Sequence, residues 1–138
     1  MELEHCINFV LTKAQHAVHQ LFKSDLAPYG VTPGQYGVLR CLWDEDCQTA
    51  RQLAERLALD GSTMTGVLDR MEQRGLIVKQ TDPRDRRALQ IQLTQKGRDL
   101  KVPLEEVIEK ANQKVLEGLE PERIEALKQL LWNISKTN

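Results

Sequence analysis

The most informative segment for the fold is Thr49–Arg98, with the sequence TARQLAERLALDGSTMTGVLDRMEQRGLIVKQTDPRDRRALQIQLTQKGR. Thr49 stands three residues before Gln52, the spacing of a capping box in which each side chain bonds the other residue's backbone N–H. This pairing predicts a short helix that opens at Thr49. Asp60 and Gly61 then interrupt the apolar pattern, because Asp caps helices well and Gly tolerates tight turns.

A second helix is predicted from Ser62 to Arg74. Its apolar residues recur with the period of one helix face: Met64, Val67, Leu68 and Met71. The opposite face carries small and hydrogen-bonding residues: Ser62, Gly66, Asp69, Arg70 and Gln73. A helix that enters the major groove of DNA needs small residues near its start and donors that reach base edges. A solvated amphipathic helix has the same period, so that alternative stays open.

A basic hairpin follows. Gly75 is placed to end the helix, and two alternating or β-branched segments, Leu76–Gln80 and Leu89–Leu93, read as strands. The connection between them holds three arginines within four residues: Arg84, Arg86 and Arg87. Guanidinium groups at a hairpin tip are exposed or bound to anions, and Asp85 can orient one of them. The alternative is a charged loop that serves only solubility.

This order of elements is typical of a winged helix-turn-helix. The segments Leu68–Ile77 (LDRMEQRGLI), Asp82–Arg87 (DPRDRR) and Leu93–Gly97 (LTQKG) resemble the MarR family of transcriptional regulators, as do Leu53-Ala54 through Met64-Thr65. The resemblance implies a mainly α (α+β) fold, in which a winged helix-turn-helix lies between N- and C-terminal dimerisation helices.

Two further helices are predicted before this stretch. Apolar residues from Leu3 to Phe22 recur at steps of three and four, and Pro28 and Gly30 close that helix. Thr32-Pro33-Gly34-Gln35 then combines a cap, a proline at the first helical position and a glutamine at the third.

Two more helices are predicted after the second strand. Thr94 can cap a helix from about Gln95, in which Pro103 should cause a kink or a break. The last helix begins at Glu120-Pro121.

The chain is expected to be one MarR-type domain, residues 1–138. Residues 1–30 and 95–138 are assigned to dimerisation helices, residues 32–94 to the winged helix-turn-helix and residues 81–88 to the wing. The terminal helices carry more apolar surface than a module of this size can bury, which favours a two-fold dimer over a monomer with a larger core. The resemblance implies an obligate homodimer with two recognition helices about one DNA turn apart.

Composition sets further bounds. With 138 residues, 41% hydrophobic and 28% charged, the chain is typical of one soluble globular domain. No apolar run approaches the roughly 20 residues of a membrane span, and the start lacks the features of a signal peptide, so we expect a cytoplasmic protein. Phosphate-binding, G-x-S-x-G and H-E-x-x-H motifs do not occur, so we expect no enzyme and no cofactor.

Charge is divided along the chain. Residues 51–98 hold ten Lys/Arg and six Asp/Glu, a net charge of +4. The remainder holds nine and fourteen, a net charge of −5, and the two parts sum to −1. The middle of the chain can therefore present a positive face to DNA.

The predicted DNA contacts come from both helices and the wing: Thr49, Arg51, Ser62, Thr63, Thr65, Gly66, Asp69, Arg70, Arg74, Arg84, Asp85, Arg86 and Arg87. Residues of the second helix are expected to read base edges. The wing arginines are expected to meet phosphates and the minor groove, with Arg87 favoured because the family's wing pairs an Asp with an Arg two positions later.

The predicted function is that of a homodimeric repressor that binds a pseudo-palindromic operator and is released by a small molecule. In the family, phenolic or lipophilic compounds bind between the dimerisation helices and the DNA-binding lobe. By position, His16, His19, Tyr36 and Trp43 can line that cleft. Core aromatics and solvated histidines are the alternative for these four residues. A winged-helix module that assembles with proteins and does not bind DNA is the alternative function.

Thiol and metal sensing are further alternatives. The odd count of three cysteines, Cys6, Cys41 and Cys47, argues against a disulfide framework. Some relatives sense oxidants through a thiol near the start of the first helix, where Cys6 lies, but no tyrosine follows Cys6 on that helix. His16 and His19 are three residues apart, yet a third metal ligand at suitable spacing is missing, so we assign no metal site.

Overall fold

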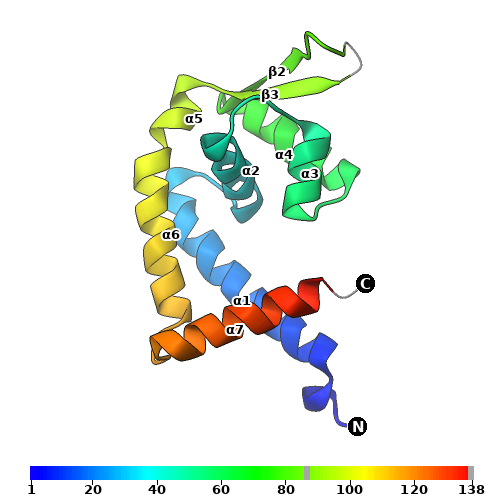
Figure 1. Ribbon diagram of the computed structural model, residues 1–138. Helices are drawn as coiled ribbons and strands as arrows, with labels where there is room; N and C mark the ends of the chain where they lie inside the picture. The colour runs from blue at the N-terminus through cyan, green and yellow to red at the C-terminus, as the bar shows by residue number, and fades with distance from the viewer. Residues whose placement is uncertain (86–87, 137–138) are drawn as a thin grey trace.

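The computed structural model describes residues 1–85 and 88–136, which form helices around a small sheet (Figure 1). The helical elements, in chain order, are η1 (Leu3–His5), α1 (Ile7–Leu26), η2 (Ala27–Tyr29), α2 (Pro33–Asp44), α3 (Ala50–Leu57), α4 (Gly61–Gln73), α5 (Gln95–Asp99), α6 (Lys101–Val115) and α7 (Pro121–Ser135). The strands are β1 (Gln48–Thr49), β2 (Ile77–Thr81) and β3 (Leu89–Leu93). The mainly α, winged helix-turn-helix prediction is confirmed.

The predicted capping boxes form as expected. Thr32 Oγ1 accepts a hydrogen bond from Gln35 N at 3.1 Å, and Thr32 N donates to Gln35 Oε1 at 3.2 Å. Thr49 and Gln52 repeat this arrangement at the start of α3, with distances of 3.1 and 2.8 Å. Local sequence signals therefore set where α2 and α3 begin.

Helix boundaries differ from the prediction at three places. Helix α4 (Gly61–Gln73) begins and ends one residue earlier than the predicted Ser62–Arg74. The first helix starts only at Ile7, because Cys6 is extended (φ −79°, ψ 118°) and separates α1 from η1, so Cys6 precedes the helix. The break expected at Pro103 falls earlier, between α5 and α6. The proline ring clashes with the carbonyl four residues back, which is that of Asp99, the last residue of α5. Pro103 itself lies in the first turn of α6, where no N–H is needed.

The sheet has the order β1-β3-β2 with antiparallel pairing. Strand β1 was not predicted, because two residues carry no periodicity. Its Gln48 is buried, and its Nε2 donates to Cys41 O at 2.9 Å and to Glu45 O at 2.6 Å. These bonds satisfy carbonyls at the end of α2, so β1 joins that helix to the sheet. Strand β2 begins one residue later than predicted, at Ile77.

The core lies in the half of the molecule that holds α2, α3, α4 and the sheet. It consists of apolar side chains from α2, α3, α4 and the sheet, together with Leu26 of α1 and Leu104 of α6. Figure 1 shows this half beside the wing, with α6 running from α5 to α7, and α7 drawn in front of α1 in this view. In residues 1–85 and 88–136, no helix combines the length and apolar character that crossing a membrane requires.

Helix α7 contributes no buried side chain to this core. Its apolar stripe stays exposed, with Trp132 64% and Leu130 61% accessible. The first turns of α1 are similar, since Ile7 is 61% accessible. The surplus of apolar surface expected at the termini is therefore present in the single chain.

Candidate nucleic-acid interface

The start of α4 is organised by one carboxylate. Asp60 Oδ1 accepts hydrogen bonds from Thr63 N at 2.7 Å and Ser62 Oγ at 2.8 Å, and Oδ2 accepts from Thr63 Oγ1 at 3.0 Å. The bonds from the Thr63 backbone and from the two hydroxyls hold the pKa of Asp60 below its ordinary value. Asp60 therefore stays charged at neutral pH and orders the first turn of α4.

One face of α4 is turned to solvent. Met64, Val67, Leu68 and Met71 are buried, and the opposite side exposes residues that the sequence assigned to DNA: Ser62, Thr63, Thr65, Asp69 and Arg70. Gly66 has no side chain to project from this face, and a Cβ there would lie 3.4 Å from Nη1 of Arg70. The Arg70 guanidinium thus lies over Gly66, in the middle of the exposed face.

An ion pair ties this face to the wing. Lys79 of β2 bonds Asp69 Oδ1 through its Nζ, which also lies 3.7 Å from Glu72 Oε1. The bond to Asp69 is the main reason that the pKa of Lys79 is raised. Lys79 was not predicted as a site residue. It lies two positions after the buried Ile77, on the same strand face, and a charge there requires a partner on α4.

The end of α4 is held by the start of α5. Lys96 Nζ donates to Arg74 O at 2.9 Å, and Thr94 Oγ1 donates to Gly75 O at 2.6 Å. The Arg74 guanidinium packs against the turn at Gly30, where a Cβ would lie 2.3 Å from Nη2. The structure thus places Arg74 at the opposite end of α4 from Ser62, apart from the other predicted contacts.

The wing extends from β2 and β3 beside α4 (Figure 1). Asp82 N donates to Ala88 O at 3.0 Å, and Asp82 Oδ1 accepts from Arg84 N at 2.8 Å. Arg84 and Asp85 are exposed. Arg86 and Arg87, the other predicted wing contacts, lie outside the described residues.

The start of α3 contributes the two remaining predicted contacts. The Thr49 hydroxyl is engaged in the capping box, and Arg51 is exposed, with its Nε 3.2 Å from Glu55 Oε1. A hollow of about 380 Å³ lies at the surface where α3 meets α4. It is lined by Ala50, Arg51, Ala54, Glu55, Leu59, Gly61, Met64 and Thr65.

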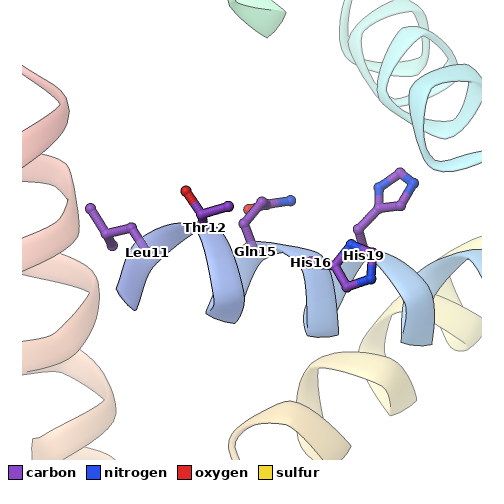
Figure 2. A pocket seen from close by; sticks show the side chains of 5 residues that line it. All are labelled: Leu11, Thr12, Gln15, His16 and His19. Atoms are coloured by element: carbon purple, nitrogen blue, oxygen red, sulfur yellow. The ribbon is translucent and has the colours of Figure 1, made fainter. Parts of the chain in front are cut away.

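The four predicted ligand residues fall into two groups. His16 and His19 are exposed and line an open hollow of about 470 Å³ along α1, with Leu11, Thr12 and Gln15 (Figure 2). In α2, Tyr36 and Trp43 pack edge to face with ring centroids 6.0 Å apart, and neither lines that hollow. Within the described chain, the structure does not bring all four residues into one pocket.

The cysteines occupy three different environments. Cys6 is half-buried before α1, and Cys41 is buried in α2, where desolvation raises the pKa of its thiol. Cys47 is exposed in a left-handed backbone conformation (φ 62°). Across residues 1–85 and 88–136, no group of three or more His, Cys, Asp or Glu side chains is placed to hold a metal ion.

Comparison with known proteins agrees with this geometry. The family model described as "MarR family" matches residues 31–89. The organic hydroperoxide resistance transcriptional regulator of Bacillus subtilis is 36% identical over 101 residues, which cover 73% of this chain and 69% of that protein. For the next four curated relatives, the match spans 51% to 65% of the relative's own length.

Solved structures match over nearly the full length. BpsR of Bordetella bronchiseptica, described with regulation of its DNA binding by 6-hydroxynicotinic acid, is 26% identical with a TM-score of 0.94, covering 100% of this chain and 99% of that one. The transcriptional repressor CouR bound to a 23-mer DNA duplex is 29% identical with a TM-score of 0.90, covering 98% and 96%. With its winged helix-turn-helix and these relatives, the chain belongs to the MarR family of DNA-binding transcriptional regulators.

Proposed function

We propose that this protein is a homodimeric repressor that inserts α4 into the major groove and lays its wing along the minor groove. The observation that carries the proposal is the exposed face of α4. This face presents hydroxyl groups and the Arg70 guanidinium to solvent, while the opposite side of the helix is buried. Ser62 and Thr65 are small enough to let the helix approach base edges. The net charge of +4 over residues 51–98 favours the same partner.

Two copies are proposed to pair through residues 1–30 and 95–138, leaving residues 32–94 to bind DNA. The exposed apolar stripe of α7 supports this, since monomers rarely leave such a stripe uncovered. Polar substitution of Leu127 and Leu131 should lower thermal stability and DNA affinity together, because an obligate dimer has no stable folded monomer. A monomeric variant that still binds DNA tightly would contradict the pairing.

A small-molecule effector is proposed to release the DNA, with the protein acting in the cytoplasm. Regulation of BpsR by 6-hydroxynicotinic acid supports an aromatic acid as the ligand class. The hollow along α1 offers His16 and His19, two groups that can bond a carboxylate. Such a ligand releases DNA only if it binds better to a state whose recognition helices are wrongly spaced.

The proposal is tested by selecting duplexes from a random library at low salt and measuring affinity for the selected and random sequences. Arg70→Ala should lower affinity for the selected duplex by about 1–3 kcal/mol and change random binding little. Arg84→Ala should weaken both kinds of duplex alike, since phosphate contacts do not depend on sequence. Retention of no duplex by the wild-type protein would favour a protein-assembly module instead.

A second candidate is a thiol-sensing regulator of the same fold. The Bacillus subtilis relative is named for organic hydroperoxide resistance, and Cys6 lies half-buried directly before α1. Treatment with an organic hydroperoxide should then release the selected duplex from the wild-type protein and leave the Cys6→Ser variant bound. Equal release from both proteins would remove Cys6 from the mechanism.

A further inference from the structure

A chain of ion pairs joins three helices. Arg40 of α2 donates through Nη1 to Glu105 Oε1 of α6 at 2.9 Å and through Nη2 to Asp44 Oδ1 at 2.7 Å. The other oxygen of Asp44, Oδ2, accepts from Arg56 Nη2 of α3 at 3.2 Å. We call these four residues the Arg40 clasp.

The clasp is more than a loose surface contact. An isolated exposed ion pair contributes little, because it loses side-chain entropy and is screened by salt. Arg40, however, spreads its planar fork between carboxylates on two helices, and its guanidinium carbon lies 5.6 Å from the centroid of the Trp43 ring. Its side chain is 34% accessible, and the bond from Arg40 is the main reason that the pKa of Asp44 is lowered.

The helices that it joins have different tasks. Helix α6 leads from the DNA-binding half to α7 and packs against α1, in the part proposed for pairing (Figure 1). Helix α3 packs against α4, the proposed recognition helix. If two copies pair through this part, the angle between α6 and α3 sets where α4 lies relative to the dimer axis.

We propose that Arg40 and Glu105 are positioning residues that set the spacing between the two recognition helices on DNA. The inference rests on the proposed function, because only a dimer on a two-part site has such a spacing. In this view the clasp makes no contact with DNA. It limits how far the DNA-binding half can pivot on α6, so only one separation of half-sites fits well.

The test uses the full-length protein and the duplex selected from a random library by the wild type. Variants of that duplex lengthen or shorten its centre by one base pair. Glu105→Ala removes the α6 end of the clasp. Its control is Glu106→Ala, the same change at the next position of α6, where an exposed carboxylate forms no ion pair with the described residues. Arg40→Lys keeps the positive charge but cannot bond both carboxylates through a planar guanidinium. It replaces Glu105→Ala as the test variant if that protein fails to fold.

Wild type and Glu106→Ala should prefer the selected spacing over either altered spacing. Glu105→Ala and Arg40→Lys should lose about fivefold of that preference, the factor expected for one coupled ion pair, while affinity for random duplex stays unchanged. Equal spacing preference in Glu105→Ala and Glu106→Ala would overturn the inference, as would a loss that is equal on every duplex, since that indicates a general structural defect. Absence of any wild-type binding would instead overturn the proposed function.

Discussion

Replacing Gly97 by alanine should destabilise the protein at the junction of the wing and α5. A Cβ on Gly97 would lie 2.4 Å from the carbonyl oxygen of Leu76 and 3.1 Å from Cδ2 of Leu93. Contacts of a Cβ below 3.0 Å are essentially never found, so the two backbones must separate by at least 0.6 Å (3.0 − 2.4). The same Leu76 oxygen accepts a hydrogen bond from Thr94 N at 3.1 Å, and that bond must lengthen too.

The magnitude follows from three contributions. Overpacking a tight contact costs about 1–3 kcal/mol. Weakening the Leu76 to Thr94 hydrogen bond adds up to about 1 kcal/mol. Alanine recovers about 0.5–1 kcal/mol, because glycine is the poorer helix former. We therefore expect the free energy of unfolding to fall by about 2 kcal/mol.

Equilibrium urea unfolding, followed by helical circular dichroism at fixed protein concentration, measures this change. Gly61→Ala is the matched control, because a Cβ at that helical position meets nothing within 4 Å. It should leave stability unchanged or raise it by a few tenths of a kcal/mol. If Gly97→Ala were as stable as Gly61→Ala, the close approach of α5 to Leu76 would not exist in solution.

Three further predictions concern single contacts. Lys79→Met should lower the free energy of unfolding by about 0.5–1 kcal/mol in urea titrations. The loss should be smaller in an Asp69→Asn background, because the ion pair with Asp69 is then already broken and only the contact to Glu72 at 3.7 Å remains. The pKa of Asp60 is lowered in the folded protein, so its stabilisation is fully present above the ordinary pKa of about 3.9 and is lost as the pH falls below that value through the lowered pKa. Asp60→Asn keeps the cap and should show less acid dependence in thermal melts. Trp43→Phe removes the 3.0 Å bond from Nε1 to Gly97 O and should cost about 1 kcal/mol in the same unfolding assay.

Most helix starts, the β2–β3 hairpin and the family resemblance could be predicted from the sequence. Signals that act over three to seven residues can be recognised in the sequence. These signals are the apolar period of α4 and the caps at Thr32, Thr49 and Asp60. The motif LTQKG can be recognised in the sequence, and the structure gives each polar or small residue in it a role. Thr94 caps α5, and Lys96 donates a hydrogen bond to the end of α4. Gly97 lets α5 approach Leu76 closely. The assignment of particular side chains to DNA bases remains a prediction.

The contacts that join these elements could not be predicted from the sequence. Strand β1 exists because Gln48 pairs with Ile91, and the clasp exists because Arg40 meets a carboxylate 65 residues away. Such pairings depend on how helices and strands pack in three dimensions, and a local period holds no information about them. His16 and Trp43 illustrate the same limit. Their positions in the sequence predicted that both line one cleft. In the structure Trp43 is hydrogen-bonded to α5, whereas His16 faces solvent.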